Sequence, residues 1–281
     1  MSGNLLGDYL RARRKVVQPE DVGLSPGERR RRVSGLRREE VALLAGISPD
    51  YYLRLEQGRD TNPSGQVLDG LARVLRLDAA AVAHLHALAG PSPRRPSRPS
   101  KPEPDQVSAG IRELIATWWS STPVIILNRY ADVLESNALA RALTPTNQPG
   151  SNVIRAAFLD PDLRKLYLNW DEMSSRAVAS LRALVGTELD DVRVVELVNE
   201  LSTASREFQD LWARYDVSPG GSGVSHFDHP VVGRMSLEFE RLAVAGTSGQ
   251  LIVVYHAAPG SPSARKLTEL GNDSAVHSGQ R

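Results

Sequence analysis

The sequence of 281 residues contains no cysteine, which excludes disulfide bonds, thiolate metal sites and cysteine nucleophiles. Aromatic residues make up only 5% of the chain, and no apolar run approaches the ~20 residues of a membrane-spanning helix. The first residues also lack the apolar core of a secretion signal, so we expect a cytoplasmic protein without a membrane partner. The remaining composition, 41% hydrophobic and 24% charged, is that of an ordinary globular protein, and the chain is long enough for two domains.

The sequence also lacks recognisable catalytic motifs. His226 and His229, with Asp228 between them, come nearest to a metal or acid–base cluster, but residues three apart on a strand point to opposite faces. Structural roles are therefore favoured for them. The glycines at 220, 221 and 223 lack the preceding strand and the following Lys-Ser/Thr pair of a phosphate-binding loop. We expect no enzymatic activity, no cofactor and no metal.

Positive charge is concentrated in the front of the chain, although the net charge is only +1. Residues 1–90 carry 14 basic and 11 acidic groups, whereas residues 105–281 carry 16 and 21. Between them, residues 91–104 contain six prolines, which predict an extended linker. Only the front half is therefore suited to a polyanion such as DNA.

The segment 35–59, GLRREEVALLAGISPDYYLRLEQGR, has the spacing of a helix-turn-helix. Gly46 falls where the turn needs a left-handed backbone, Ser48 can cap the second helix, and Pro49 suits its first position. The pattern predicts that Asp50, Tyr51 and Arg54 point outward. Ile47 is predicted to fill the angle between the two helices. The predicted core positions within the helices recur at helical spacing: Val41, Leu44, Ala45, Tyr52 and Leu55. An ordinary helical hairpin would reproduce only part of this combination.

This segment resembles the Xre, or Cro/C1-type, helix-turn-helix family, and with the following NPSGQVLDGLARVLRLD it is similar to MmyB-like regulators. The resemblance implies a double-stranded DNA operator as partner. It also implies base contacts from Ser48, Pro49, Asp50, Tyr51 and Arg54, and phosphate contacts from Arg37, Arg38, Gln57 and Arg59. Arg54 is suited to guanine and Asp50 to cytosine N4. Because one such helix reads few base pairs, we expect a homodimer on two half-sites.

The rest of the front half predicts an all-α domain of five helices over residues 1–90. Leu5, Tyr9 and Leu10 give the first helix an apolar face, and Ser64 and Asp78 can cap the last two. The predicted core positions of those two helices are Leu68, Leu71, Ala72 and Leu75, and Val82, Leu85, Leu88 and Ala89. The long connection from Lys15 to Leu36 is interpreted as an Arg-rich insertion.

Residues 105–265 predict an α+β domain with an antiparallel sheet and inserted helices. Expected strands are 123–127, 132–136, 224–227, 233–242 and 250–257, with a hairpin turn at 246–249. Expected helices are 106–120, 152–158, 161–169, 171–186, 190–203 and 205–214. Residues 266–281 are expected to form a flexible tail.

Four phrases of this half, FLDPDLRKLYLNW, LWARYDV, HFDHPVVGRMSLEFERL and LIVVYHAAPGSPS, resemble the MmyB-like ligand-binding domain. The resemblance implies a PAS-like fold that holds a small apolar molecule such as a fatty acid. Large side chains that could line its pocket, or simply fill the core, are Trp118, Phe158, Trp170, Trp212, Phe227 and Tyr255. The whole sequence thus predicts a transcription regulator controlled by a small effector. A protein partner for the second domain, or an enzyme fused to a DNA-binding domain, stays open.

Overall fold

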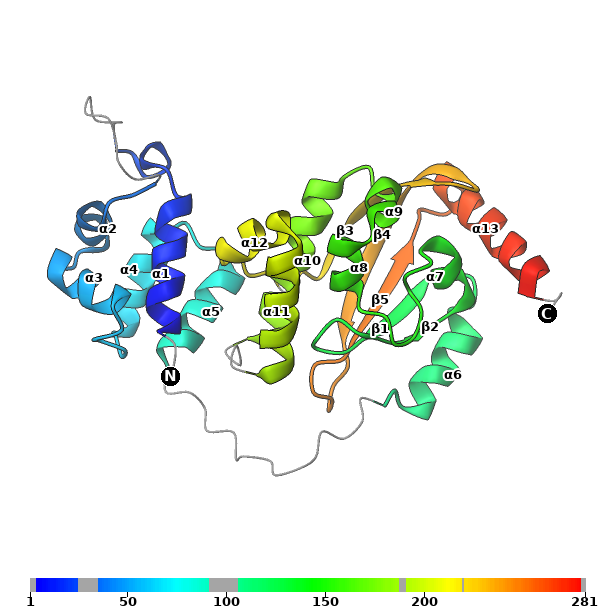
Figure 1. Ribbon diagram of the computed structural model, residues 1–281, viewed down its shortest axis with the longest axis horizontal. Coiled ribbons are helices and arrows are strands. Elements are labelled where there is room, and N and C mark those ends of the chain that lie inside the picture. Colours follow the sequence, from blue (N-terminus) through cyan, green and yellow to red (C-terminus); the bar gives the residue numbers. More distant parts are fainter. Residues whose placement is uncertain (1–3, 25–34, 91–105, 187–190, 219, 279–281) are drawn as a thin grey trace. The chain divides into compact units, whose positions relative to one another are not determined.

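The structure is a computed structural model that describes residues 4–24, 35–90, 106–186, 191–218 and 220–278, with side chains up to residue 272 (Figure 1). The predicted proline-rich linker and most of the predicted insertion after Lys15 lie outside the described residues. Contacts divide the chain into two units, the first formed by residues 1–99, 186–188 and 210–218, and the second by the remainder.

The first unit is all α-helical in its described part, as predicted. Its helices are α1 (Leu5–Val16), α2 (Arg38–Ala45), α3 (Pro49–Glu56), α4 (Gly65–Val74) and α5 (Ala79–Ala89), with a short 3-10 helix, η1 (Pro19–Val22). The predicted caps are confirmed, since Ser48, Ser64 and Asp78 each accept a hydrogen bond from a backbone N–H in the first turn. The core contains these fully buried residues: Tyr9, Leu10, Leu36, Val41, Tyr52, Leu55, Leu71, Leu75 and Leu85.

The burial of α2 differs slightly from the sequence pattern. Val41 and Ala42 are fully buried, whereas the predicted core positions Leu44, Ala45 and Ile47 are only partly buried. Here α4 approaches α2 at backbone level, because a Cβ added at position 70 would lie 3.0 Å from the carbonyl oxygen of Ala45. Backbone contact therefore replaces side-chain packing at the end of α2, and Gly70 permits it.

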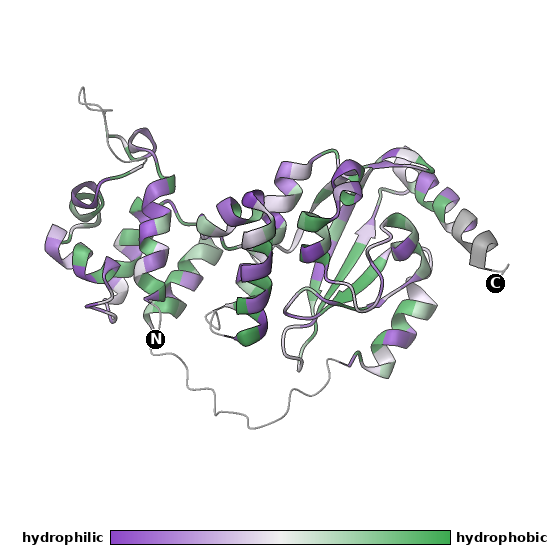
Figure 2. Ribbon diagram, in the orientation of Figure 1, coloured by the Kyte–Doolittle hydropathy of each residue, from purple (hydrophilic) through white to green (hydrophobic). Residues whose placement is uncertain are grey.

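The second unit contains a five-stranded antiparallel sheet. Its strands are β1 (Val124–Leu127), β2 (Val133–Ser136), β3 (Ser222–His229), β4 (Gly233–Ala243) and β5 (Leu251–His256). In space they lie in the order β2-β1-β5-β4-β3, so β5 pairs with β1 on one side and β4 on the other. Hydrophobic residues dominate β1 and β5 (Figure 2), as expected for central strands. The predicted α+β fold is confirmed, and its arrangement is PAS-like.

Helices cover both faces of this sheet. On one face α6 (Ala109–Trp118) packs Ile111 and Ile115 on Val124, Ile126 and Ile252. On the other, Phe227, Met235, Leu237 and Phe239 meet inserted helices and the last helix. The other helices of the second half are α7 (Ala138–Leu143), α8 (Val153–Leu159), α9 (Pro161–Leu166), α10 (Trp170–Val185), α11 (Val192–Ala204), α12 (Arg206–Ala213) and α13 (Pro262–Ser278). Most core side chains of this unit thus lie between the second face and its helices.

Three predictions about this unit need correction. Helix α7 was not predicted, and the expected flexible tail is helical, because α13 runs through Ser278 and buries Leu267 and Leu270. The spacing also predicts an apolar face of Ile111, Leu114, Ile115 and Trp118 for the helix at 106–120, and only half of this face packs on the sheet. Ile115 is buried, but Leu114 and Trp118 are exposed, since α6 contacts the sheet along a narrow stripe.

Candidate functional site

The turn between α2 and α3 fixes the exposed face of α3. Gly46 has φ +72°, a left-handed conformation that a side chain would strain. The Ser48 hydroxyl accepts from the Tyr51 backbone N–H at 3.1 Å, and Pro49 occupies the first helical position. Tyr52 and Leu55 on the opposite face are fully buried. These contacts hold α3 rigidly with one side open to solvent.

The exposed side of α3 carries a small ionic and aromatic cluster. Asp50 and Arg54 form an ion pair across one helical turn, and the Arg54 guanidinium lies 5.5 Å from the centre of the Tyr51 ring. Ser48 and Pro49 are exposed beside it. The sequence prediction assigned Asp50 and Arg54 to separate bases. Their i, i+4 spacing is the signal that they also bind each other.

Buried Glu56, at the end of α3, connects three elements. Its carboxylate accepts from Arg14 Nε of α1 at 2.7 Å and from Arg38 Nε of α2 at 2.6 Å. The side chain of Glu56 is 1% exposed, that of Arg14 8% and that of Arg38 45%. Burial alone would raise the pKa of Glu56, but the hydrogen bonds from both arginines outweigh it and lower the pKa. Sequence reasoning missed this cluster.

Of the four residues predicted to contact phosphates, only Arg38 belongs to the Glu56 cluster. Arg37, Gln57 and Arg59 are exposed. Arg38 is also accessible, but part of its charge is compensated by Glu56. The Arg38 guanidinium is consequently held in place rather than free to rotate.

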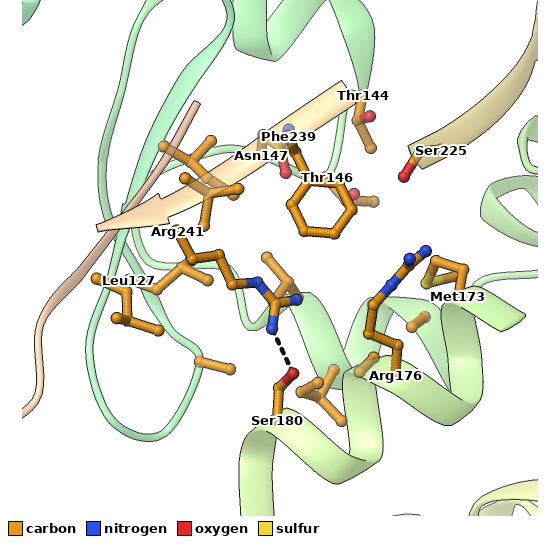
Figure 3. Close-up of a pocket in the computed structure, with 18 of the residues that line it drawn as sticks. Leu127, Thr144, Thr146, Asn147, Met173, Arg176, Ser180, Ser225, Phe239 and Arg241 are labelled. Atoms are coloured by element: carbon orange, nitrogen blue, oxygen red, sulfur yellow. Dashed lines mark hydrogen bonds between the residues drawn. The ribbon is translucent and has the colours of Figure 1, made fainter. Parts of the chain in front are cut away.

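The second unit contains a cavity of about 100 Å³ between the sheet and helices α8, α9 and α10. Its walls are mainly apolar and include Ile125 and Leu127 of β1, Ile154 of α8, Leu181 of α10 and Val253 of β5. Two arginines also line it (Figure 3), Arg176 of α10 and Arg241 of β4. Such a space, apolar with a few convergent polar groups, has the character of a small-molecule site.

The two arginines lie close to the same aromatic ring. The guanidinium carbons of Arg176 and Arg241 are 4.9 and 5.4 Å from the centre of the Phe239 ring. Arg241 donates to the Ser180 hydroxyl, and Arg176 donates to the Val224 carbonyl at 3.2 Å. Burial lowers the pKa of Arg241, and the nearby positive charge of Arg176 lowers it further.

Comparison with protein families gives two matches. A helix-turn-helix domain family matches residues 5–85. The family described as the MmyB-like transcription regulator ligand binding domain matches residues 107–270, more than half of the chain. The chain belongs to this family. A search of curated proteins found no match. The predicted resemblances are thus confirmed, and the chain is a DNA-binding transcription regulator with an MmyB-like ligand-binding domain.

The cavity of this MmyB-like regulator is lined by only one of the six large side chains predicted for a pocket, Tyr255. Trp118 is 75% exposed on α6, so its assignment is wrong. Phe158, Trp170 and Phe227 belong to the adjoining core, where the Trp170 indole N–H donates to Glu207 at 2.7 Å. Trp212 is partly buried on α12 and is not among the described lining residues.

The histidines near the end of β3 make individual structural contacts. A ring nitrogen of His226 lies 2.7 Å from the Ser236 hydroxyl, and one of His229 lies 3.1 Å from the Ala142 carbonyl oxygen. Across the described residues, no group of three or more acidic or histidine side chains has metal-binding geometry. Nor does any helix of the described segments combine the length and apolar character needed to cross a bilayer. Both matched families are regulatory rather than enzymatic.

Proposed function

We propose that this MmyB-like regulator reads its operator with the exposed side of α3. Arg54, held by Asp50 and stacked near Tyr51, presents its remaining N–H groups to a guanine, and Ser48 and Pro49 approach neighbouring bases. Arg37, Arg38, Gln57 and Arg59 lie at the edge of this surface and contact phosphates. The open face of a rigidly capped α3 supports this proposal.

The regulator acts as a homodimer in this proposal. A single α3 covers only a few base pairs, whereas two copies on half-sites about one helical turn apart give useful specificity. Analytical ultracentrifugation with and without a two-half-site operator tests this point, and a monomer on the operator would contradict it.

We also propose that the second unit binds a small effector with an apolar body. The cavity beside α10 is the observation that supports it, because its walls come from the sheet and from three separate helices. An effector that favours one packing of these helices shifts the population of the regulator toward that form. Operator affinity then depends on effector concentration.

The experiment starts with selection of an operator from random DNA by the full-length chain. Candidate small molecules are then titrated while operator affinity is followed by fluorescence anisotropy. Leu181→Trp, which fills the cavity from α10, should abolish the response, whereas Leu168→Trp at an exposed position should not. Operator affinity that no small molecule changes would contradict effector control and leave DNA binding intact. Stoichiometric copurification of a protein would favour a protein partner.

A further inference from the structure

The segment of residues 210–218 belongs to the first unit, although it lies within the part of the sequence that matches the ligand-binding family. Helix α12 therefore begins in the second unit, with residues 206–209, and ends in the first, with residues 210–213. A continuous helix moves as one body, so a displacement of its first turn reaches its last turn.

The first turn of α12 contacts all three helices that border the cavity, α8, α9 and α10. The ring of Phe208, which is fully buried, packs edge-to-face on Phe158 of α8 with 5.2 Å between the ring centres. The Glu207 carboxylate accepts a hydrogen bond from Arg164 of α9 at 2.6 Å and one from the Trp170 indole N–H of α10 at 2.7 Å. A change in the packing of any of these helices therefore acts on α12.

The residues that follow α12 are attached to α1 of the first unit. Asp216 forms an ion pair with Arg13, whose side chain is 14% exposed, and a second one with Arg214 at 3.0 Å. The Tyr215 ring meets the Tyr9 ring edge-to-face with 6.2 Å between the ring centres. Tyr215 has φ +55°, a left-handed conformation that is strained for an aromatic residue. Charge and ring packing thus hold this short segment on α1.

Helix α1 is linked in turn to α3, the helix proposed to read DNA. Arg14, which follows Arg13, donates from Nε to the Glu56 carboxylate at the end of α3 at 2.7 Å. The Glu56 carbonyl oxygen accepts from the side chains of Asn4 at 2.8 Å and Arg11 at 3.0 Å. The position of α1 therefore affects the position of α3.

We propose that α12, with residues 214–217, transmits the state of the cavity to α3 through α1. This inference rests on the proposed effector control and adds its route. An effector that changes the packing of α8, α9 or α10 moves α12, and the contacts of Tyr215 and Asp216 carry the movement to α1. Because coupling between two sites is reciprocal, operator DNA acts on the cavity helices by the same route.

A purely structural role of residues 214–217 gives a different expectation. In that case the segment stabilises the first unit to the same extent whatever the packing of the second. A double-mutant cycle separates the two roles, because only coupled sites give effects that do not add. One arm of the cycle changes the first turn of α12, and the other changes the attachment to α1.

The test is hydrogen exchange measured by mass spectrometry on the full-length chain. Phe208→Leu removes the ring contact with α8 and should speed exchange from α1 by about fivefold or more. In a background with Tyr215→Gly and Asp216→Asn, which removes both attachments, the same substitution should change exchange from α1 by less than about twofold. The matched control is Leu270→Ala, which perturbs the core of the second unit from α13 and should leave α1 unchanged.

Operator DNA selected by the full-length chain gives the reciprocal measurement. Its binding should change exchange from α8 and α10 in the parent, and should not do so in the variant with Tyr215→Gly and Asp216→Asn. Glu238→Gln, an exposed change on β4, should behave like the parent. If Phe208→Leu does not fold, as judged by circular dichroism, Glu207→Gln gives the same comparison through α9 and α10.

Exchange from α1 that Phe208→Leu leaves unchanged, or speeds equally in both backgrounds, would overturn the proposal. Equal acceleration by Leu270→Ala would also overturn it. If no small molecule changes operator affinity while the cycle still shows coupling, the route is retained and effector control is rejected. If an effector acts equally on the parent and on the variant with Tyr215→Gly and Asp216→Asn, effector control is retained and the route is rejected.

Discussion

Replacement of Glu56 by glutamine should strongly destabilise the helix-turn-helix unit. Removal of one charge from a buried ion pair leaves the other uncompensated, which costs about 3–5 kcal/mol. Arg14 keeps its hydrogen bond to the Leu36 carbonyl at 2.9 Å, and an amide oxygen at position 56 can still accept from its Nε. We therefore expect the lower end, about 3 kcal/mol. For a domain of this size, such a loss lowers the Tm by roughly 12–24 °C.

Hydrogen exchange measured by mass spectrometry on the full-length chain locates the effect. In Glu56→Gln, the free energy of opening should fall by about 3 kcal/mol for peptides from α1 and α3. For peptides from β4 and β5 it should be unchanged. Glu39→Gln, an exposed change on α2, is the matched control and should stay within about 0.5 kcal/mol of the parent. If α1 and α3 are protected from exchange as well in Glu56→Gln as in Glu39→Gln, the ionic cluster is not a source of stability.

The same cluster predicts a pH dependence. Because folding lowers the pKa of Glu56, its stabilising contribution is complete above the pKa of an unfolded glutamate, about 4.3. It is lost as the pH falls through the lower, folded-state value. Between pH 7 and pH 3, exchange from α1 and α3, corrected for its intrinsic pH dependence, should therefore rise more in the parent than in Glu56→Gln. A parallel rise in both proteins would contradict this sign.

Four further substitutions test the DNA surface. Arg54→Ala should weaken operator binding by ~1–3 kcal/mol and relax preference at one base pair in competition assays. Asp50→Ala releases Arg54 and should increase affinity for random-sequence DNA, and unchanged random-sequence affinity would count against the observed pair. Arg38→Ala should weaken binding to all DNA sequences alike, and it should reduce the slope of log K against the logarithm of the salt concentration by about one. Ser48→Ala removes the cap of α3 and should lower the unfolding free energy by about 1 kcal/mol, measured by urea denaturation.

The helix-turn-helix was predictable because its determinants are local. Gly46, Ser48 and Pro49 act on backbone atoms within a few residues, so their order in the sequence is sufficient. The Glu56 cluster is different. Arg14 and Glu56 are 42 positions apart in the sequence. A glutamate at the end of a helix looks the same in the sequence whether it is buried in an ion pair or exposed to water.

Five of the six large side chains proposed for a pocket lie outside this cavity, because the prediction relied on aromatic size. Size indicates that a side chain tends to be buried, but not which space it borders, and Trp118 is exposed despite its size. A more specific signal was present. Arg241 continues the two-residue alternation of Met235, Leu237 and Phe239, which places an arginine on the core-facing side of a strand.

The central position of β5 has a consequence for the order in which the chain folds. Leu251–His256 lies between β1 and β4, and its partner strand β1 precedes it by more than a hundred residues. During synthesis, the two halves of the sheet cannot join until this late segment leaves the ribosome, whereas the helices of residues 5–89 make their contacts much earlier. A nascent or prematurely terminated chain can therefore contain all the helix-turn-helix residues before the sheet of the second unit, and with it the cavity, is complete. Ribosomes stalled within the codons for β5 would then carry the DNA-binding helices without the cavity of the second unit.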